Sequence, residues 1–259
     1  MSKKVNYKTL LPRMHYWHAV AFVLTALAAS FFMGQTSHQL TLGHLAKDEL
    51  MSQKSAVLVS GSHSVFDIQV STIVIALMLL STIVPGLYMT RLQKQYANGL
   101  KKKVMPWRWL DMAVTTAIMV ETIAILSGVQ DIMTLKLIGG LMAITCLLGW
   151  LGEKAMTDGK KLVRPIFITS LITGALPWLL IAVSAVATPF YAAVRAPWYI
   201  YALYASSLGA FSLIALNQWR YYGKVRQWKD YMFVEWNHLL ITDTAKLLFA
   251  VILIIGLRK

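Results

Sequence analysis

Lys246 has the most unusual chemical setting in this chain of 259 residues. It lies about twelve residues into an apolar stretch, residues 234–257. If that stretch crosses a membrane, an ionised lysine there costs at least about 2.5–3.5 kcal/mol. Such an amine needs a counter-charge, a changed protonation state or covalent modification, and it is also the nucleophile that condenses with an aldehyde to form a Schiff base. A structural ion pair between two helices is the alternative interpretation.

Three carboxylates also lie inside apolar stretches, away from their ends: Asp111, Glu121 and Asp243. Asp243 precedes Lys246 by three residues, so the two side chains lie on adjacent turns of one helix. Helical side chains lean toward the N-terminus of their helix, which carries the Lys246 amine toward the level of Asp111. Because a protonated Schiff base is costly in a low dielectric without a nearby carboxylate, Lys246 and Asp111 are predicted to pair.

Long apolar stretches must position these groups. Of all residues, 57% are hydrophobic and only 14% are charged, whereas soluble chains carry about 25% charged residues. A membrane-spanning helix needs roughly 20 apolar residues. Seven stretches reach or approach this length: residues 14–33, 68–89, 107–126, 133–151, 165–188, 197–219 and 234–257. We therefore predict an all-α integral protein of the plasma membrane, in which residues 1–259 form a single seven-helix bundle.

The first stretch has a second interpretation, because basic residues precede it as they do in a secretory signal peptide. Its apolar run is longer than the usual signal core of about 7–15 residues. We therefore expect residues 14–33 to remain as the first helix, with a cleaved signal peptide as the alternative.

The distribution of basic residues predicts the orientation of the bundle. Of the 25 Lys and Arg residues, 18 lie in alternate connecting segments on one side and only six lie on the other. Cytoplasmic loops carry the excess of positive charge, so the N-terminus is predicted to be cytoplasmic and the C-terminus extracellular. The longest loop, residues 34–67, is then extracellular, either as a short hairpin around residues 57–59 or as an irregular cap.

Several classes of function are disfavoured. The net charge of +14 could indicate a nucleic-acid partner, but the basic residues form short clusters between apolar runs. The single cysteine excludes a disulfide framework and a cysteine-based zinc site. The sequence has no hydrolase triad, phosphate-binding loop or clustered metal ligands. We therefore expect no nucleic-acid partner, no metal and no enzymatic activity.

Four ordered segments carry a family resemblance: Arg108-Trp109-Leu110-Asp111, Gly149-Trp150-Leu151-Gly152-Glu153-Lys154, Pro177-Trp178, and the run from Ala215 to Lys246. Together they resemble the microbial rhodopsins, and specifically the heliorhodopsins. The resemblance is convincing over residues 105–165 and 211–248 and weak over the first two helices. Heliorhodopsins are also inverted relative to other microbial rhodopsins and carry an extended first extracellular loop, in agreement with the predicted orientation.

The resemblance implies that all-trans-retinal is bound covalently to Lys246 as a protonated Schiff base, with Asp111 as its counter-ion. Most heliorhodopsins have glutamate at the position of Asp111, so the shorter side chain here would alter the ion-pair distance and the absorption colour. The retinal site is further expected to include Trp109, Thr115, Trp178, Phe211, Thr242 and Asp243. For Phe211, core packing without ligand contact is the alternative.

The histidines of the first helix are a departure from the family pattern. By a gapless reading, the histidines that the family has in its first two helices fall on Phe22 and Val84. His15 and His18 lie near the first of these positions, and His18 is a candidate proton-relay group. The alternative is that both are interfacial histidines beside the aromatic residues that separate them.

Two glutamates are further relay candidates. Glu121, like Asp243, falls where the family usually has an apolar residue, and an intramembrane carboxylate is a functional signal by default. Glu153 matches a glutamate at the cytoplasmic end of the fourth helix. A cross-helix hydrogen bond is the alternative role of Glu121.

The resemblance implies a light-sensing photoreceptor that signals rather than pumps. One rival is light-driven or light-gated proton transport through Asp111, Glu121 and Asp243, and another is a retinal-free seven-helix channel or scaffold. Expected partners are membrane lipid, a second copy of the chain and a cytoplasmic signalling protein that binds the basic, aromatic loops. Plain positive-inside bias is the alternative explanation of those loops.

Overall fold

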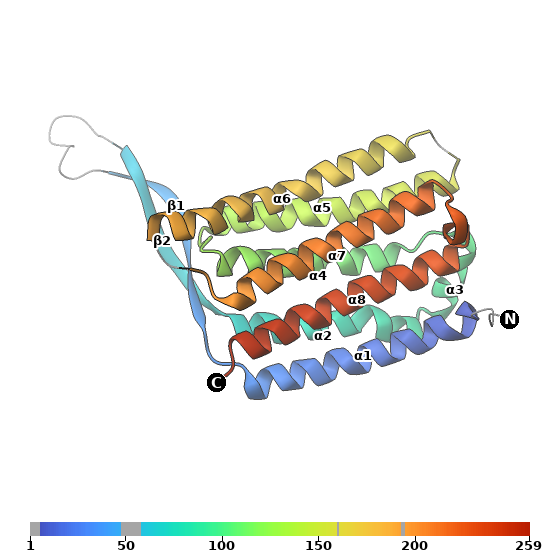
Figure 1. Ribbon diagram of the computed structural model, residues 1–259, viewed down its shortest axis with the longest axis horizontal. Coiled ribbons are helices and arrows are strands. Elements are labelled where there is room, and N and C mark those ends of the chain that lie inside the picture. Colours follow the sequence, from blue (N-terminus) through green and yellow to red (C-terminus); the bar gives the residue numbers. More distant parts are fainter. Residues whose placement is uncertain (1–5, 48–57, 160, 193–194) are drawn as a thin grey trace.

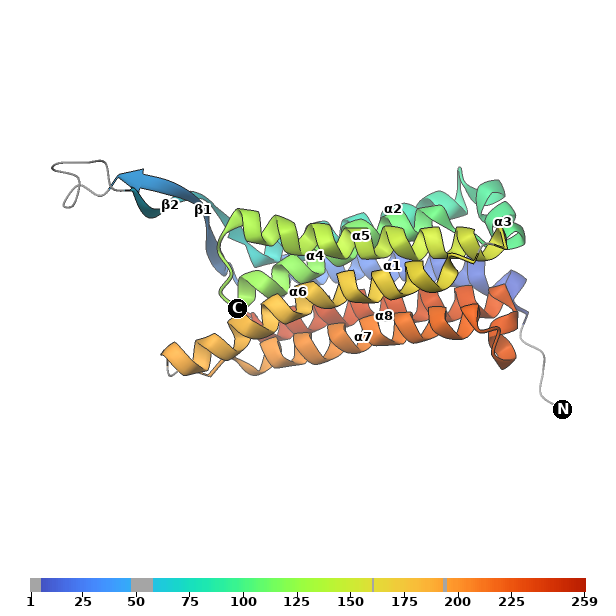
Figure 2. The ribbon, with the colours of Figure 1, turned by 90° about the horizontal axis from the view of Figure 1, so that it is seen from above.

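The computed structural model describes residues 6–47, 58–159, 161–192 and 195–259. Within these residues, seven helices are long and apolar enough to cross a membrane, and they lie side by side in one bundle (Figure 1 and Figure 2). They are α1 (Tyr7–Phe32), α2 (Val70–Met89), α4 (Pro106–Leu126), α5 (Ile132–Thr157), α6 (Val163–Ala192), α7 (Trp198–Tyr222) and α8 (Tyr231–Gly256). The predicted seven-helix membrane fold is confirmed.

Several helices extend beyond the predicted stretches. Helix α1 begins at Tyr7 rather than at residue 14, and α5 continues to Thr157 rather than ending at residue 151. An apolar count marks only the hydrocarbon layer, about 30 Å thick, whereas a helix continues into the polar headgroup region. The start of α1 and the C-terminus lie at opposite ends of the bundle, as an odd number of spans requires (Figure 1). Which end is cytoplasmic stays a prediction.

The loop between α1 and α2 is a β-hairpin that projects from the end of the bundle where the C-terminus lies (Figure 1). Strands β1 (Ser37–Lys47) and β2 (Leu58–Gln69) pair antiparallel, with a bulge between Leu40 and Thr41. Of the two alternatives, the hairpin is correct, but it is longer than predicted. Residue 57, part of the apolar triplet that suggested it, lies outside the described residues.

Asp131 joins this hairpin to the bundle. Its Oδ2 caps α5 by accepting hydrogen bonds from the Thr134 amide and hydroxyl, each at 2.7 Å. These hydrogen bonds hold the pKa of the Asp131 carboxyl below its usual value. The Gly43 amide donates to Oδ1 at 3.4 Å, and the Thr41 amide donates to the Gln130 carbonyl at 2.9 Å. The hairpin is therefore fixed to the start of α5.

The surface and interior of the bundle suit a membrane. Large apolar side chains face outward on the long helices, as on Leu24 of α1, Leu137 of α5 and Val183 of α6. Helix α4 is the most enclosed of the spans, and α6 and α7 are the least. Two short helices, α3 (Gln93–Lys102) and η1 (Arg226–Lys229), lie at the end opposite the hairpin (Figure 1). The enclosed position of α4 is what surrounds Asp111 with protein.

Candidate functional site

Lys246 and Asp111 meet in the interior of the bundle. Nζ of Lys246 lies 2.5 Å from Oδ2 of Asp111 and donates a hydrogen bond to it, joining α8 to α4. The Lys246 side chain is 3% exposed and that of Asp111 is 12% exposed. The predicted pairing of the two residues is therefore present, although their positions along the two helices differ. The lean of the lysine toward the start of α8 closes the gap, as expected.

Asp243 and Phe22 complete the immediate surroundings of the amine. Oδ1 of Asp243 lies 3.9 Å from Nζ of Lys246, from the preceding turn of α8. Nζ also lies 5.7 Å from the centre of the Phe22 ring on α1. The position where the family has a histidine therefore does face the lysine, but here it presents an apolar ring.

The two threonines of the predicted site hydrogen-bond within their own helices. The Thr115 hydroxyl donates to the Asp111 carbonyl at 2.8 Å, and the Thr242 hydroxyl donates to the His238 carbonyl at 3.0 Å. Both are buried near the ion pair. Thr242 lines the cavity described next, whereas Thr115 is not among its lining residues.

An apolar cavity lies between α4, α5, α6, α7 and α8, and Lys246 forms part of its wall. Trp109, Trp178 and Phe211 line it, as the sequence predicted. Most other lining side chains are apolar, among them Met112, Met119, Val120, Met142, Leu171 and Ile214. An elongated apolar molecule with an aldehyde end could therefore lie in protein with its reactive carbon at the amine.

Two glycines allow the aromatic walls of this cavity to form. A Cβ atom at Gly149 of α5 would lie 2.4 Å from the Trp109 ring, and one at Gly174 of α6 would lie 2.5 Å from the Phe211 ring. Either methyl group would have to displace the ring that it meets. The absence of side chains at these positions is thus part of the shape of the cavity.

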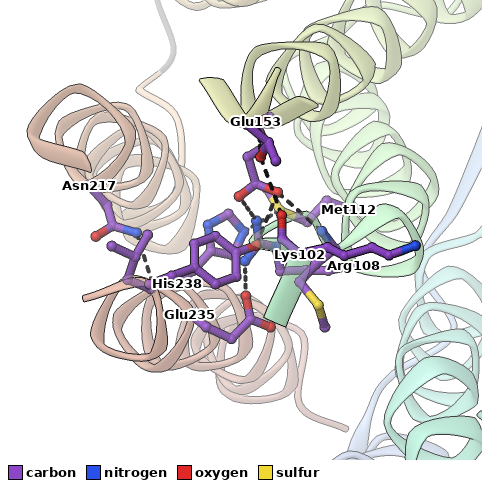
Figure 3. Close-up of polar contacts among 11 residues, drawn as sticks. Lys102, Arg108, Met112, Glu153, Asn217, Glu235 and His238 are labelled. Atoms are coloured by element: carbon purple, nitrogen blue, oxygen red, sulfur yellow. Dashed lines mark hydrogen bonds and ion pairs between the residues drawn. The ribbon is translucent and has the colours of Figure 1, made fainter. Parts of the chain in front are cut away.

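Arg108 is one of the 18 basic residues that the sequence analysis assigned to the connecting segments, and the structure corrects that assignment. Its side chain is 3% exposed, and its two terminal nitrogens form ion pairs with Glu153 of α5 and Glu235 of α8 (Figure 3). Glu153 also accepts hydrogen bonds from the Tyr231 hydroxyl at 3.2 Å and the Met105 amide at 3.3 Å. Without Arg108, 17 basic residues remain on the predicted cytoplasmic side and six on the other, so the predicted orientation does not change.

Glu235 and His238 are buried functional candidates that the sequence analysis missed. His238 packs edge-on against Trp109, with ring centres 5.1 Å apart, and its Nε2 lies 2.8 Å from the Met112 sulfur (Figure 3). Glu235 stood one residue inside the predicted end of its span, where a carboxylate is ordinary. A polar stripe could have revealed both, because positions 235, 238, 242 and 246 share one helix face.

Glu121 is not brought to Lys246. Its Oε2 lies 2.8 Å from Nζ of Lys136 on α5, and Oε1 lies where a Cβ on Gly139 would be. The Lys136 side chain is 67% exposed, so the pair lies at the outer surface of the bundle. This geometry favours the cross-helix alternative for Glu121 over a relay role.

The histidines of α1 point inward. His15 is buried, and its ring packs edge-on against Tyr88 and Tyr96 at centre distances of 5.3 Å and 4.9 Å. Nδ1 of His18 lies 2.5 Å from Oδ2 of Asp243. Both histidines therefore face the interior of the bundle, whereas Tyr16 and Trp17 between them are exposed. Whether the two histidines lie at the depth of the membrane interface stays a prediction.

A comparison with protein families adds an independent finding. The family model described as Heliorhodopsin matches residues 7–257, nearly the whole chain. The chain belongs to the heliorhodopsin family. No curated protein matches the chain. Membership confirms the resemblance inferred from the motifs and makes this chain a multi-pass membrane protein of a retinal-binding family.

The residues around the cavity of this heliorhodopsin fit retinal. The cavity offers an apolar lining, a buried primary amine on its wall and a carboxylate in contact with that amine. Lys246 would hold the group covalently, Asp111 would supply the negative charge, and Trp109, Trp178 and Phe211 would enclose its apolar part. The described residues contain no group of three or more His, Cys, Asp or Glu side chains that could hold a metal.

We predict that Gly149→Ala reduces the amount of visible pigment formed when all-trans-retinal is added to the purified protein. The new methyl group must displace the Trp109 ring, which lines the cavity, and overpacking of this kind typically costs about 1–3 kcal/mol. Gly140→Ala on the same helix is the matched control, since a Cβ there meets nothing within 4 Å. Equal pigment yields for the two variants would contradict this account of the cavity wall.

We predict that Glu153→Gln lowers the melting temperature of the protein far more than Glu121→Gln does. Removing one member of a buried ion network typically costs about 3–5 kcal/mol, because Arg108 keeps its charge and loses a partner. An exposed pair such as Lys136–Glu121 contributes about 0–1 kcal/mol. Thermal unfolding in detergent measures both, and equal losses would show that the two glutamates have equivalent surroundings.

Proposed function

We propose that this heliorhodopsin is a light sensor that binds all-trans-retinal as a protonated Schiff base on Lys246, with Asp111 as counter-ion. The observation that supports the proposal is a single contact. The Lys246 amine, on the wall of an apolar cavity, lies 2.5 Å from a carboxylate of another helix.

Each group of the site has a distinct task. Asp111 holds negative charge beside the Lys246 nitrogen, in a site where little water screens it. The aromatic and methionine side chains of the cavity exclude water and fix the orientation of an apolar ligand. Retinal, when bound, supplies the absorption of visible light and the photoisomerisation, which the protein side chains themselves cannot provide.

The ion network around Arg108 supports sensing over pumping. Arg108 lies one turn before Asp111 on α4, and both of its carboxylate partners are fully buried. Arg108 keeps its charge at physiological pH, so it cannot itself relay a proton, and it lies between Lys246 and the α3 end of the bundle. A transport route to that end would have to pass this network.

Proton transport is the second candidate function. It is favoured by the second carboxylate, Asp243, at 3.9 Å from the Lys246 amine and in contact with His18. Glu121, the third group of the predicted route, lies elsewhere with Lys136.

The experiment that tests the sensor proposal is reconstitution of the purified chain with all-trans-retinal. We expect a visible absorption band for the wild type and for Lys136→Ala, and no band for Lys246→Ala. Asp111→Asn should form a pigment whose band is shifted. When the pH is raised, that band should be lost at a lower pH than in the wild type, because a protonated Schiff base without its counter-charge has a lower pKa. If Lys246 forms only a structural ion pair, the wild type will stay colourless.

Illumination of vesicles that contain the pigment separates sensing from transport. We expect no light-induced pH change in the suspension. A change that a protonophore abolishes would replace the sensor proposal by proton transport, and it should then be reduced by Asp243→Asn. The expected loss of transport rests on the position of Asp243 beside Lys246, whereas Glu121→Gln should leave any such signal unchanged.

We also propose that the α7–α8 connection is the surface for a cytoplasmic partner, and that the chain forms a homodimer. The guanidinium of Arg220 lies 4.7 Å from the centre of the Trp228 ring, and the Trp228 indole N–H donates to Asn217 at 2.8 Å. Lys224 and Arg226 adopt left-handed backbone conformations, with φ of 49° and 45°. These contacts support a preformed basic surface, whereas the homodimer rests on family membership alone.

A further inference from the structure

The surroundings of Lys246 contain one carboxylate more than its own charge can balance. Oδ2 of Asp111 lies 2.5 Å from the amine and Oδ1 of Asp243 lies 3.9 Å from it. None of the three side chains is more than 12% exposed. One ammonium neutralises one carboxylate, and an uncompensated charge in such a place is strongly destabilising. A second positive charge, or a proton on one carboxylate, must therefore be present.

His18 is placed to supply that charge. Its Nδ1 lies 2.5 Å from Oδ2 of Asp243, the carboxylate oxygen opposite the one that faces Lys246. The two atoms are in contact, and an imidazolium at His18 would place its positive charge against this carboxylate. The His18 side chain is 16% exposed and that of Asp243 is 5% exposed. Asp243 thus bridges two nitrogen bases.

The charged and titratable groups nearest this pair are Lys246, Asp111, His15 and Glu235. Behind them, His15 packs on Tyr88 of α2 and Tyr96 of α3, and Glu235 pairs with Arg108 of α4. Arg108 already faces two carboxylates, Glu153 and Glu235, so it has no charge to spare for Asp243, and Lys246 is bound to Asp111. Both ring nitrogens of His15 are buried without a hydrogen-bond partner among the described residues, so no carboxylate holds a proton there.

We propose that His18 is an imidazolium in the resting protein and that Asp243 holds it in this form. Two cations, Lys246 and His18, then balance two carboxylates, Asp111 and Asp243. The charge balance follows from the chain alone, with the free amine of Lys246, and does not need retinal. Any effect of the His18–Asp243 pair on the colour of the pigment rests on the retinal-binding function proposed above.

Nitrogen-15 NMR of the histidine rings in the retinal-free protein in lipid at pH 8 tests the proposal directly. An unperturbed histidine has a pKa of about 6.5 and is neutral at that pH, and burial lowers the pKa of His38 further. We expect one imidazolium signal in the wild type that is lost in His18→Asn and in Asp243→Asn. It should persist in Glu121→Gln, the carboxylate control paired with Lys136.

Six neutral histidines in the wild type would overturn the proposal, as would an imidazolium signal that survives in His18→Asn. If His18→Asn fails to fold, the wild type and Asp243→Asn still decide, because the signal must disappear with the carboxylate. These measurements use no retinal, so their result is independent of whether the chain forms a pigment.

The colour of the reconstituted pigment is a second readout. In His18→Asn, Asp243 has no cation of its own, so its charge should follow pH and move the visible band. The double variant His18→Asn/Asp243→Asn should have a band that no longer moves with pH in that range. A His18→Asn band as constant as that of the wild type would contradict the proposal, whereas a colourless wild type would instead refute the proposed retinal function.

Discussion

The ion pair between Lys246 and Asp111 is the constraint on which the rest of this structure depends. A lysine at this depth can be buried only if a carboxylate from another helix reaches it, so α8 must pack beside α4. Helix α4 is the most enclosed span, which removes Asp111 from water and strengthens its attraction for the amine. The same lysine forms part of the wall of the apolar cavity. Lys246 therefore both forms the ion pair and lines the cavity.

A second ion pair, Arg108–Glu235, joins the same two helices, but here the cation is on α4 and the anion is on α8. On α4 a cation, Arg108, lies one turn before the anion Asp111, whereas on α8 the anion Glu235 lies before the cation Lys246. Sliding or rotating one helix against the other would separate both pairs and leave buried charges without partners. Buried ion pairs add little net stability compared with apolar packing, but they penalise wrong arrangements heavily. We infer that these contacts specify the register of α4 and α8 in a bundle whose apolar surfaces would fit in several ways.

The sequence predicted the seven helices and the Lys246–Asp111 pair because length, hydropathy and an isolated intramembrane cation are local signals. It could not place Arg108, since an arginine at the edge of a span looks the same whether it faces the loop or the interior. The burial of Glu235, at the start of α8, could not be predicted for the same reason. His15 and His18 depended on the rotation of α1 about its axis, which an apolar pattern distributed around the helix does not reveal. The hairpin was one of two alternatives because its strands alternate only weakly.

The pairing also indicates how a local event at Lys246 could reach the surface of the protein. Any displacement of the lysine nitrogen from Asp111 leaves a carboxylate unpaired in the interior, at a cost of several kcal/mol. The neighbouring carboxylate Asp243 already has a contact on α1 through His18, so a change at Lys246 is felt by α1 as well as by α4. Helix α1 in turn packs through His15 on Tyr96 of α3, at the end of the bundle opposite the hairpin. A change of charge in the interior can therefore reach that end through Asp243, His18, the backbone of α1 and the contact of His15 with Tyr96.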